Sequence, residues 1–149
     1  MTPSPEHSMD ASDGLVGKCL PSWQLHVALG LACALTIGTT MRWSEPSAFH
    51  VVILVASAVA VVIHPRSHAA TIFLGIVAFT VLVNDPGLSL WIIPTVTGVH
   101  ATHTLAALVA VVPWGSKVEW PALIPSLHRF WIVQAASQLL VVVALLLSA

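Results

Sequence analysis

Five apolar runs, each ended by a short break of charged, histidine or proline residues, dominate the sequence. They cover about residues 23–41, 46–63, 67–83, 90–112 and 128–148. A helix needs about 20 residues, at about 1.5 Å each, to cross a hydrocarbon core about 30 Å thick. The first, fourth and fifth runs reach that length, and the second and third are shorter. We therefore expect a bundle of about five transmembrane helices, or four if the short second and third runs do not both span.

The small share of charged residues supports a lipid environment. Only 7% of the residues are charged, 57% are hydrophobic and the mean hydropathy is +0.93, whereas soluble domains carry about 25% charged residues. Such a chain has too few polar side chains to cover a small soluble fold, and lipid tolerates an apolar surface. The expected fold class is an all-α integral membrane protein in contact with the lipid bilayer. The net charge of −1 leaves no basic stripe for phosphates, so we expect no nucleic-acid partner.

The chain divides into a polar tail and an apolar remainder. Residues 1–21 are rich in Ser and Pro and predict a flexible tail, and residues 22–149 predict a polytopic membrane domain. Basic residues concentrate on the cytoplasmic side of membrane proteins. With five spans, four of the five basic residues fall on one side, namely Lys18, Arg66, Lys117 and Arg129. We therefore expect a multi-pass protein of the cell membrane with a cytoplasmic N-terminus, and a segment at the interface over residues 114–127.

Three small residues recur at steps of four in the first run. Gly30, Ala34 and Gly38 would share one face of a helix. Small side chains let a second helix approach closely in a membrane. This face therefore predicts helix packing, either with other integral membrane subunits or by self-association.

Polar residues face each other across the fourth and fifth runs. His100 and His103 lie on one side of the fourth predicted helix, and Gln134 and Gln138 on one side of the fifth. For antiparallel neighbours, the count from the helix ends places His100 level with Gln138 and His103 level with Gln134. Hydrogen bonds between them would satisfy groups that are costly in hydrocarbon. We therefore expect a buried polar cluster of these four residues.

Four interpretations of this cluster remain open. It can hold two helices together, it can line the His, Gln and Thr pathway of a small oligomeric transporter or channel, it can relay protons through histidine, or it can belong to a haem- or metal-binding protein. His100 and His103 are weak metal candidates, because imidazole binds Zn, Cu and Fe but two ligands are too few. We predict no cofactor and no catalytic residues, since the sequence shows no phosphate loop, Ser-His-Asp pattern or paired carboxylates.

Residues 97–103 carry a family resemblance. The stretch Thr-Gly-Val-His-Ala-Thr-His resembles the Thr-Gly-x-His-x-x-His motif on a membrane helix of subunit III of haem-copper respiratory oxidases, and residues 128–131 resemble that family's entry into its final span. The chain lacks the intramembrane carboxylate of the family in its first three runs. The resemblance implies an accessory subunit without a redox centre, packed against a catalytic subunit. The small size, the short loops, the small-residue face and the lack of a catalytic pattern favour the same kind of protein, so the leading interpretation is a non-catalytic accessory or interaction subunit of a larger membrane complex.

Overall fold

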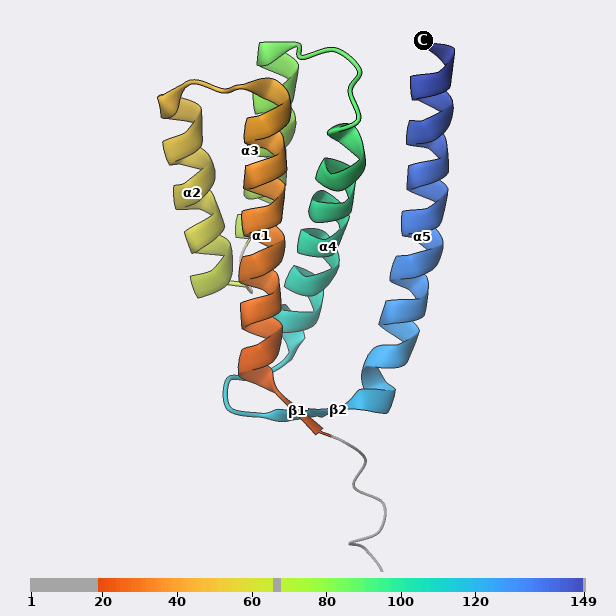
Figure 1. Cartoon of the computed structure of the whole chain (residues 1–149). Coiled ribbons are helices and arrows are strands. Elements are labelled where there is room, and N and C mark those ends of the chain that lie inside the picture. Colours follow the sequence, from red (N-terminus) through yellow and green to blue (C-terminus); the bar gives the residue numbers. More distant parts are fainter. Residues whose placement is uncertain (1–18, 66–67, 149) are drawn as a thin grey trace, which may run out of the picture.

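The computed structural model describes residues 19–65 and 68–148, which form five helices and one pair of short strands (Figure 1). Successive helices run in opposite directions. In chain order the elements are β1 (Cys19–Pro21), α1 (Ser22–Ser44), α2 (Ala48–Ile63), α3 (Ala69–Asn84), α4 (Ile92–Val111), β2 (Lys117–Glu119) and α5 (Trp120–Leu147). The mostly helical fold was expected from the apolar runs. Most of the expected tail, residues 1–18, lies outside the described residues.

The two strands pair at one end of the bundle, which we call the strand end (Figure 1). They are antiparallel, with Leu20 opposite Val118. The first turn of α1 is bound to the same segment, since the Ser22 N–H donates to the Ser116 carbonyl and the Gly115 N–H donates to Ser22 Oγ, both at 3.0 Å. The sequence predicts a flexible tail over residues 1–21, and this prediction is wrong for residues 19–21, because the chain that enters α5 pairs with their backbone.

The helices differ in length, and the difference shapes the bundle. Among the described residues, α1, α4 and α5, with 23, 20 and 28 residues, are long and apolar enough to cross a membrane. The apolar helices α2 and α3 have 16 residues each, which is a length of about 24 Å. In Figure 1, α2 ends well short of the strand end that α1 reaches.

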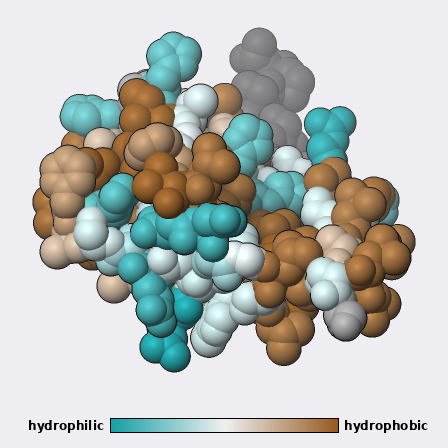
Figure 2. Space-filling model, turned by 90° about the horizontal axis from the view of Figure 1, so that it is seen from above, coloured by the Kyte–Doolittle hydropathy of each residue, from teal (hydrophilic) through white to brown (hydrophobic). Residues whose placement is uncertain are grey.

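The apolar core lies among α1 to α4, whereas α5 stands at the side of the bundle (Figure 1). Fully buried side chains come from all four of these helices, including Leu29, Leu54, Phe73 and Val109. Helix α5 buries one described residue, Gln134. Its other faces expose large apolar side chains, and hydrophobic residues gather on the flank at the right of Figure 2, where α5 lies.

The tightest contact of the bundle joins α1 and α4. A Cβ added to Gly98 would lie 2.6 Å from Thr36 Oγ1 and 3.1 Å from the Thr36 N and Cα atoms. Thr36 Oγ1 donates to the Ala32 carbonyl at 2.8 Å and lies 3.3 Å from Thr102 Oγ1. The absent side chain at position 98 therefore sets how closely the two backbones approach.

Candidate functional site

The polar residues of α4 and α5 meet in a connected hydrogen-bond cluster. Thr97 Oγ1 accepts from Gln134 Nε2 and from Gln138 Nε2, each at 2.8 Å, and donates to the Ile93 carbonyl at 3.0 Å. The Gln138 amide also donates to the Ile93 carbonyl at 2.9 Å. His100 Nδ1 lies 3.0 Å from Gln134 Oε1. We call Thr97, His100, Gln134 and Gln138 the amide cluster.

The hydrogen bond to Gln134 indicates which ring nitrogen of His100 carries a hydrogen. An amide oxygen accepts hydrogen bonds and never donates them, so His100 donates from Nδ1. The ring of Phe130 stacks on that of His100, with centroids 4.8 Å apart and planes inclined by 29°. Gln134 is 5% exposed, and burial of an amide is costly unless it is hydrogen-bonded. The arrangement is therefore suited to fixing α5 on α4.

The pairing across the two helices differs from the expected pairing by one helical turn. Counting from the expected ends matched His100 with Gln138, but the structure pairs His100 with Gln134 and places Thr97 beside Gln138. The physical reason is the start of α5, which begins at Trp120 and not near residue 128. The earlier start moves the midpoint of α5 by about one turn toward the N-terminus. Residues 120–127, expected at the interface, belong to this helix.

His103 does not join the amide cluster. Its side chain is exposed and lines a hollow of about 470 Å³ between α4 and α5. Arg129 and Ser126 lie on the α5 side of the same hollow, and His100 borders it. The expectation that His103 pairs with Gln134 is therefore wrong, because Gln134 uses its amide on Thr97 and His100.

The small-residue face of α1 borders an open groove. Gly30, Ala34 and Gly38 lie on the α1 side of an apolar groove of about 530 Å³, and α2 forms the other side with Val55 and Val59 among its lining residues. A Cβ at Gly38 would meet no atom within 4 Å, and one at Gly30 would lie 4.0 Å from Val62 Cγ2. The sequence predicted that a second helix packs closely against this face. In the structure, the close packing of two helices occurs at Gly98, where α4 meets α1.

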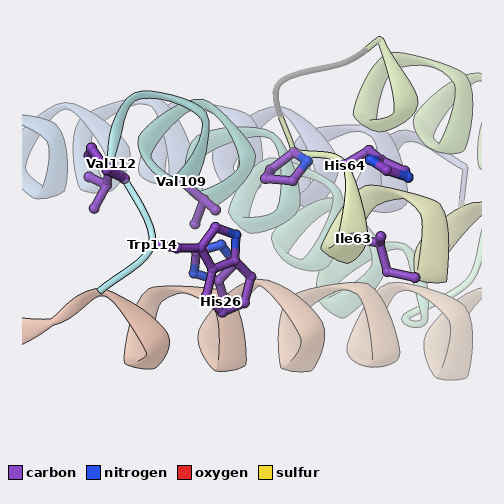
Figure 3. A pocket seen from close by; sticks show the side chains of 8 residues that line it. His26, Ile63, His64, Val109, Val112 and Trp114 are labelled. Carbon is purple, nitrogen blue, oxygen red and sulfur yellow. The ribbon is translucent and has the colours of Figure 1, made fainter. Parts of the chain in front are cut away.

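A histidine outside the amide cluster occupies a second polar position that the sequence did not single out. His26 in α1 is 5% exposed, and its Nδ1 lies 3.0 Å from the Ser22 carbonyl. Its ring lies against that of Trp114, with centroids 3.8 Å apart. Figure 3 shows the two rings together on one side of a hollow, with Ile63 and His64 on the other side. The sequence did not predict the burial of His26, because the residue lies near the end of the first predicted helix. The burial depends on the segment between α4 and β2, which places Trp114 against the His26 ring.

The described residues also bear on metal binding. Within residues 19–65 and 68–148, no three His, Cys, Asp or Glu side chains lie close enough together to hold a metal ion. His100 engages Gln134 through Nδ1, and His103 faces the hollow beside Arg129. The two weak metal candidates, His100 and His103, therefore make different contacts.

No protein-family model, curated protein or solved structure matches the chain.

Proposed function

We propose that the protein is a non-catalytic interaction subunit that spans the cell membrane and binds a helix of another integral membrane subunit. The membrane placement is supported by the three long apolar helices and by the many large apolar side chains that face outward. The basic residues favour a cytoplasmic strand end. The resemblance of residues 97–103 to oxidase subunit III favours a respiratory complex as the setting.

The open groove between α1 and α2 is the observation that carries this proposal. Lipid tails are as apolar as leucine, so helices associate in a membrane through close packing and not through the hydrophobic effect. Ala34 and Gly38 present little side chain and are exposed, so the backbone of α1 is accessible along the groove. A partner helix fits such a surface better than it fits a ridge of large side chains.

The amide cluster supports the same proposal from the other side of the bundle. All four of its side chains take part in hydrogen bonds between α4 and α5 or with their own backbone. In lipid, such contacts stabilise helix association by about 1 kcal/mol each. The polar groups of the membrane interior therefore hold the subunit together, and the apolar faces are left for the partner.

The test compares two glycines on outward-facing surfaces. Gly38→Leu fills the groove, and Gly75→Leu adds the same side chain on α3, where a Cβ also meets no atom within 4 Å. We expect the wild type and Gly75→Leu to purify in mild detergent as a complex with a defined second membrane protein, and Gly38→Leu to purify alone. A wild-type protein that purifies as a lone monomer, or a complex that survives Gly38→Leu unchanged, would contradict the proposal.

A further inference from the structure

We propose that the hollow beside His26 binds a membrane-soluble ring compound of the hydroquinone class, which donates a hydrogen bond from its hydroxyl group to His26 Nε2. Nothing in the amide cluster or the α1–α2 groove requires this site. Membrane placement of the chain supplies the route of access for the ligand. The binding itself is measured in detergent and does not depend on the proposed partner.

The first step is the state of the His26 ring. Its Nδ1 lies 3.0 Å from the Ser22 carbonyl oxygen, which can only accept, so Nδ1 carries a hydrogen. In the neutral ring Nε2 is then an acceptor with a free lone pair. This atom is buried and has no hydrogen-bond partner among the described residues. Buried polar atoms in native proteins nearly always have a partner, so this acceptor is available to a donor from outside the chain.

The second step is the space beside this ring. The hollow measures about 610 Å³ and is bordered by His26, Ile63, Val109, Val112 and Trp114, among other residues (Figure 3). Such a volume lies in the range of small-molecule sites, which is about 300–1,000 Å³, and far exceeds the space of one water molecule. It exists because α2 ends at Ile63, while α1 and α4 continue toward the strand end.

The third step is the chemistry that the lining selects. Valine, isoleucine and proline side chains make most of the wall, so the body of the ligand is apolar. The Trp114 ring is 67% exposed and offers a flat face to an aromatic ring. The polar end of the ligand must donate, because Nε2 accepts. A hydroquinone has two such hydroxyls, whereas the oxidised quinone has only carbonyl acceptors and cannot satisfy Nε2.

Trp114 also controls access to the imidazole. It lies against His26 and follows α4 in the segment that leads to β2. Its high exposure means that few contacts hold its outer face. In the proposed complex the indole turns away from His26, so that Nε2 opens to the hollow and the ligand ring takes part in the stack. Ligand binding is therefore expected to change the fluorescence of this tryptophan.

The experiment measures binding of three forms of one compound to the full chain in detergent. The probes are a benzohydroquinone with a decyl tail, kept reduced, its quinone and its dimethyl ether. We expect the hydroquinone to bind about tenfold more tightly than either of the others, because only it makes the hydrogen bond. Nitrogen-15 NMR of labelled histidines should show a shift of the His26 Nε2 resonance on hydroquinone addition alone. Equal binding of the three forms, or no shift, would overturn the proposal.

Two variants separate the site from the fold. His26→Phe retains a ring for Trp114 and removes the acceptor, and we expect it to abolish the preference for the hydroquinone. His50→Phe is the control, since His50 lies at the opposite end of the bundle with its Nδ1 2.8 Å from Ser47 Oγ. Val112→Trp fills the hollow and leaves His26 in place, so it should weaken hydroquinone binding at least as strongly. Tight hydroquinone binding by a folded Val112→Trp protein would also overturn the proposal.

Discussion

Helix α4 packs against α1 and against α5, and these two contacts are held by different physical means. Against α1, the absence of a side chain at Gly98 brings the backbones together, and the buried Thr36 hydroxyl is satisfied by a carbonyl of its own helix. Against α5, side chains bridge the two helices, with Gln134 bonded to Thr97 and His100. Shape therefore determines the first contact, and hydrogen-bond complementarity determines the second.

The two contacts of α4 tolerate different substitutions. The α1–α4 contact is sensitive to added volume, and the hydroxyl contact between Thr36 and Thr102 that joins these helices is 3.3 Å long, against 2.8 Å for the amide bonds to Thr97 between α4 and α5. The α4–α5 contact has room for volume, because a hollow of about 470 Å³ lies beside it, but it depends on polar partners. Three substitutions test this contrast, in order of decreasing effect.

The largest effect is expected at Gly98. In Gly98→Val the new Cβ would lie 2.6 Å from Thr36 Oγ1 and 3.1 Å from Thr36 backbone atoms, which cannot move without shifting α1. We expect a loss of about 3 kcal/mol in the free energy of unfolding, at the upper end of the usual cost of overpacking. Denaturant titration in detergent, followed by circular dichroism, measures it.

Gly75→Val is the matched control for this substitution. A Cβ at Gly75 meets no atom within 4 Å, so the change should cost less than about 1 kcal/mol, as a surface substitution in a helix does. Equal destabilisation by Gly98→Val and Gly75→Val would show that the close packing of Gly98 against Thr36 does not determine the α1–α4 contact.

The second effect is expected at Gln134. Gln134→Leu removes the bonds to Thr97 and His100 and leaves the imidazole without its partner. We expect a loss of about 1–2 kcal/mol, within the range of buried hydrogen bonds and of polar contacts between membrane helices. Because α5 has few other buried contacts, proteolysis should release this helix before the remaining bundle unfolds.

A double-mutant cycle with His100→Leu separates the pair from the individual residues. When both partners are apolar, no unpaired polar group remains from this pair, so the double variant should be more stable than the sum of the single changes predicts. Additive losses would mean that His100 and Gln134 act independently, against the bond between them.

The sequence predicted the helices and the face of α5 that lies against α4. It did not predict which residues pair across α4 and α5, or the close packing at Gly98. The apolar runs indicated five helices, and the spacing of Gln134 and Gln138 correctly turned them toward α4. The predicted pairing of His100 was wrong by one helical turn, because α5 begins at Trp120 and not near residue 128. The prolines among the apolar residues of this stretch did not indicate a helix. The role of Gly98 could not be predicted, because it depends on the rotation of α4 against Thr36, and periodicity does not report rotation between helices.

The smallest effect is expected at His103, which the sequence placed in the cluster. Its side chain is exposed and borders the hollow beside Arg129. His103→Ala should therefore change the free energy of unfolding by less than about 0.5 kcal/mol, as substitutions away from buried contacts do. The same titration measures it, with Gln134→Leu for comparison. A loss as large as that of Gln134→Leu would place His103 back in the contact between α4 and α5.

The strand pair β1–β2 restricts the number of times that the chain can cross a bilayer. One strand precedes α1 and the other follows α4, and the two are hydrogen-bonded neighbours. The chain must therefore return to the side from which it started, so the crossings between the strands must be even in number. If the long apolar helices α1, α4 and α5 each cross, then the short helices α2 and α3 cross together or not at all, which gives five or three crossings in total. A topology with four crossings would place β1 and β2 on opposite sides of the membrane.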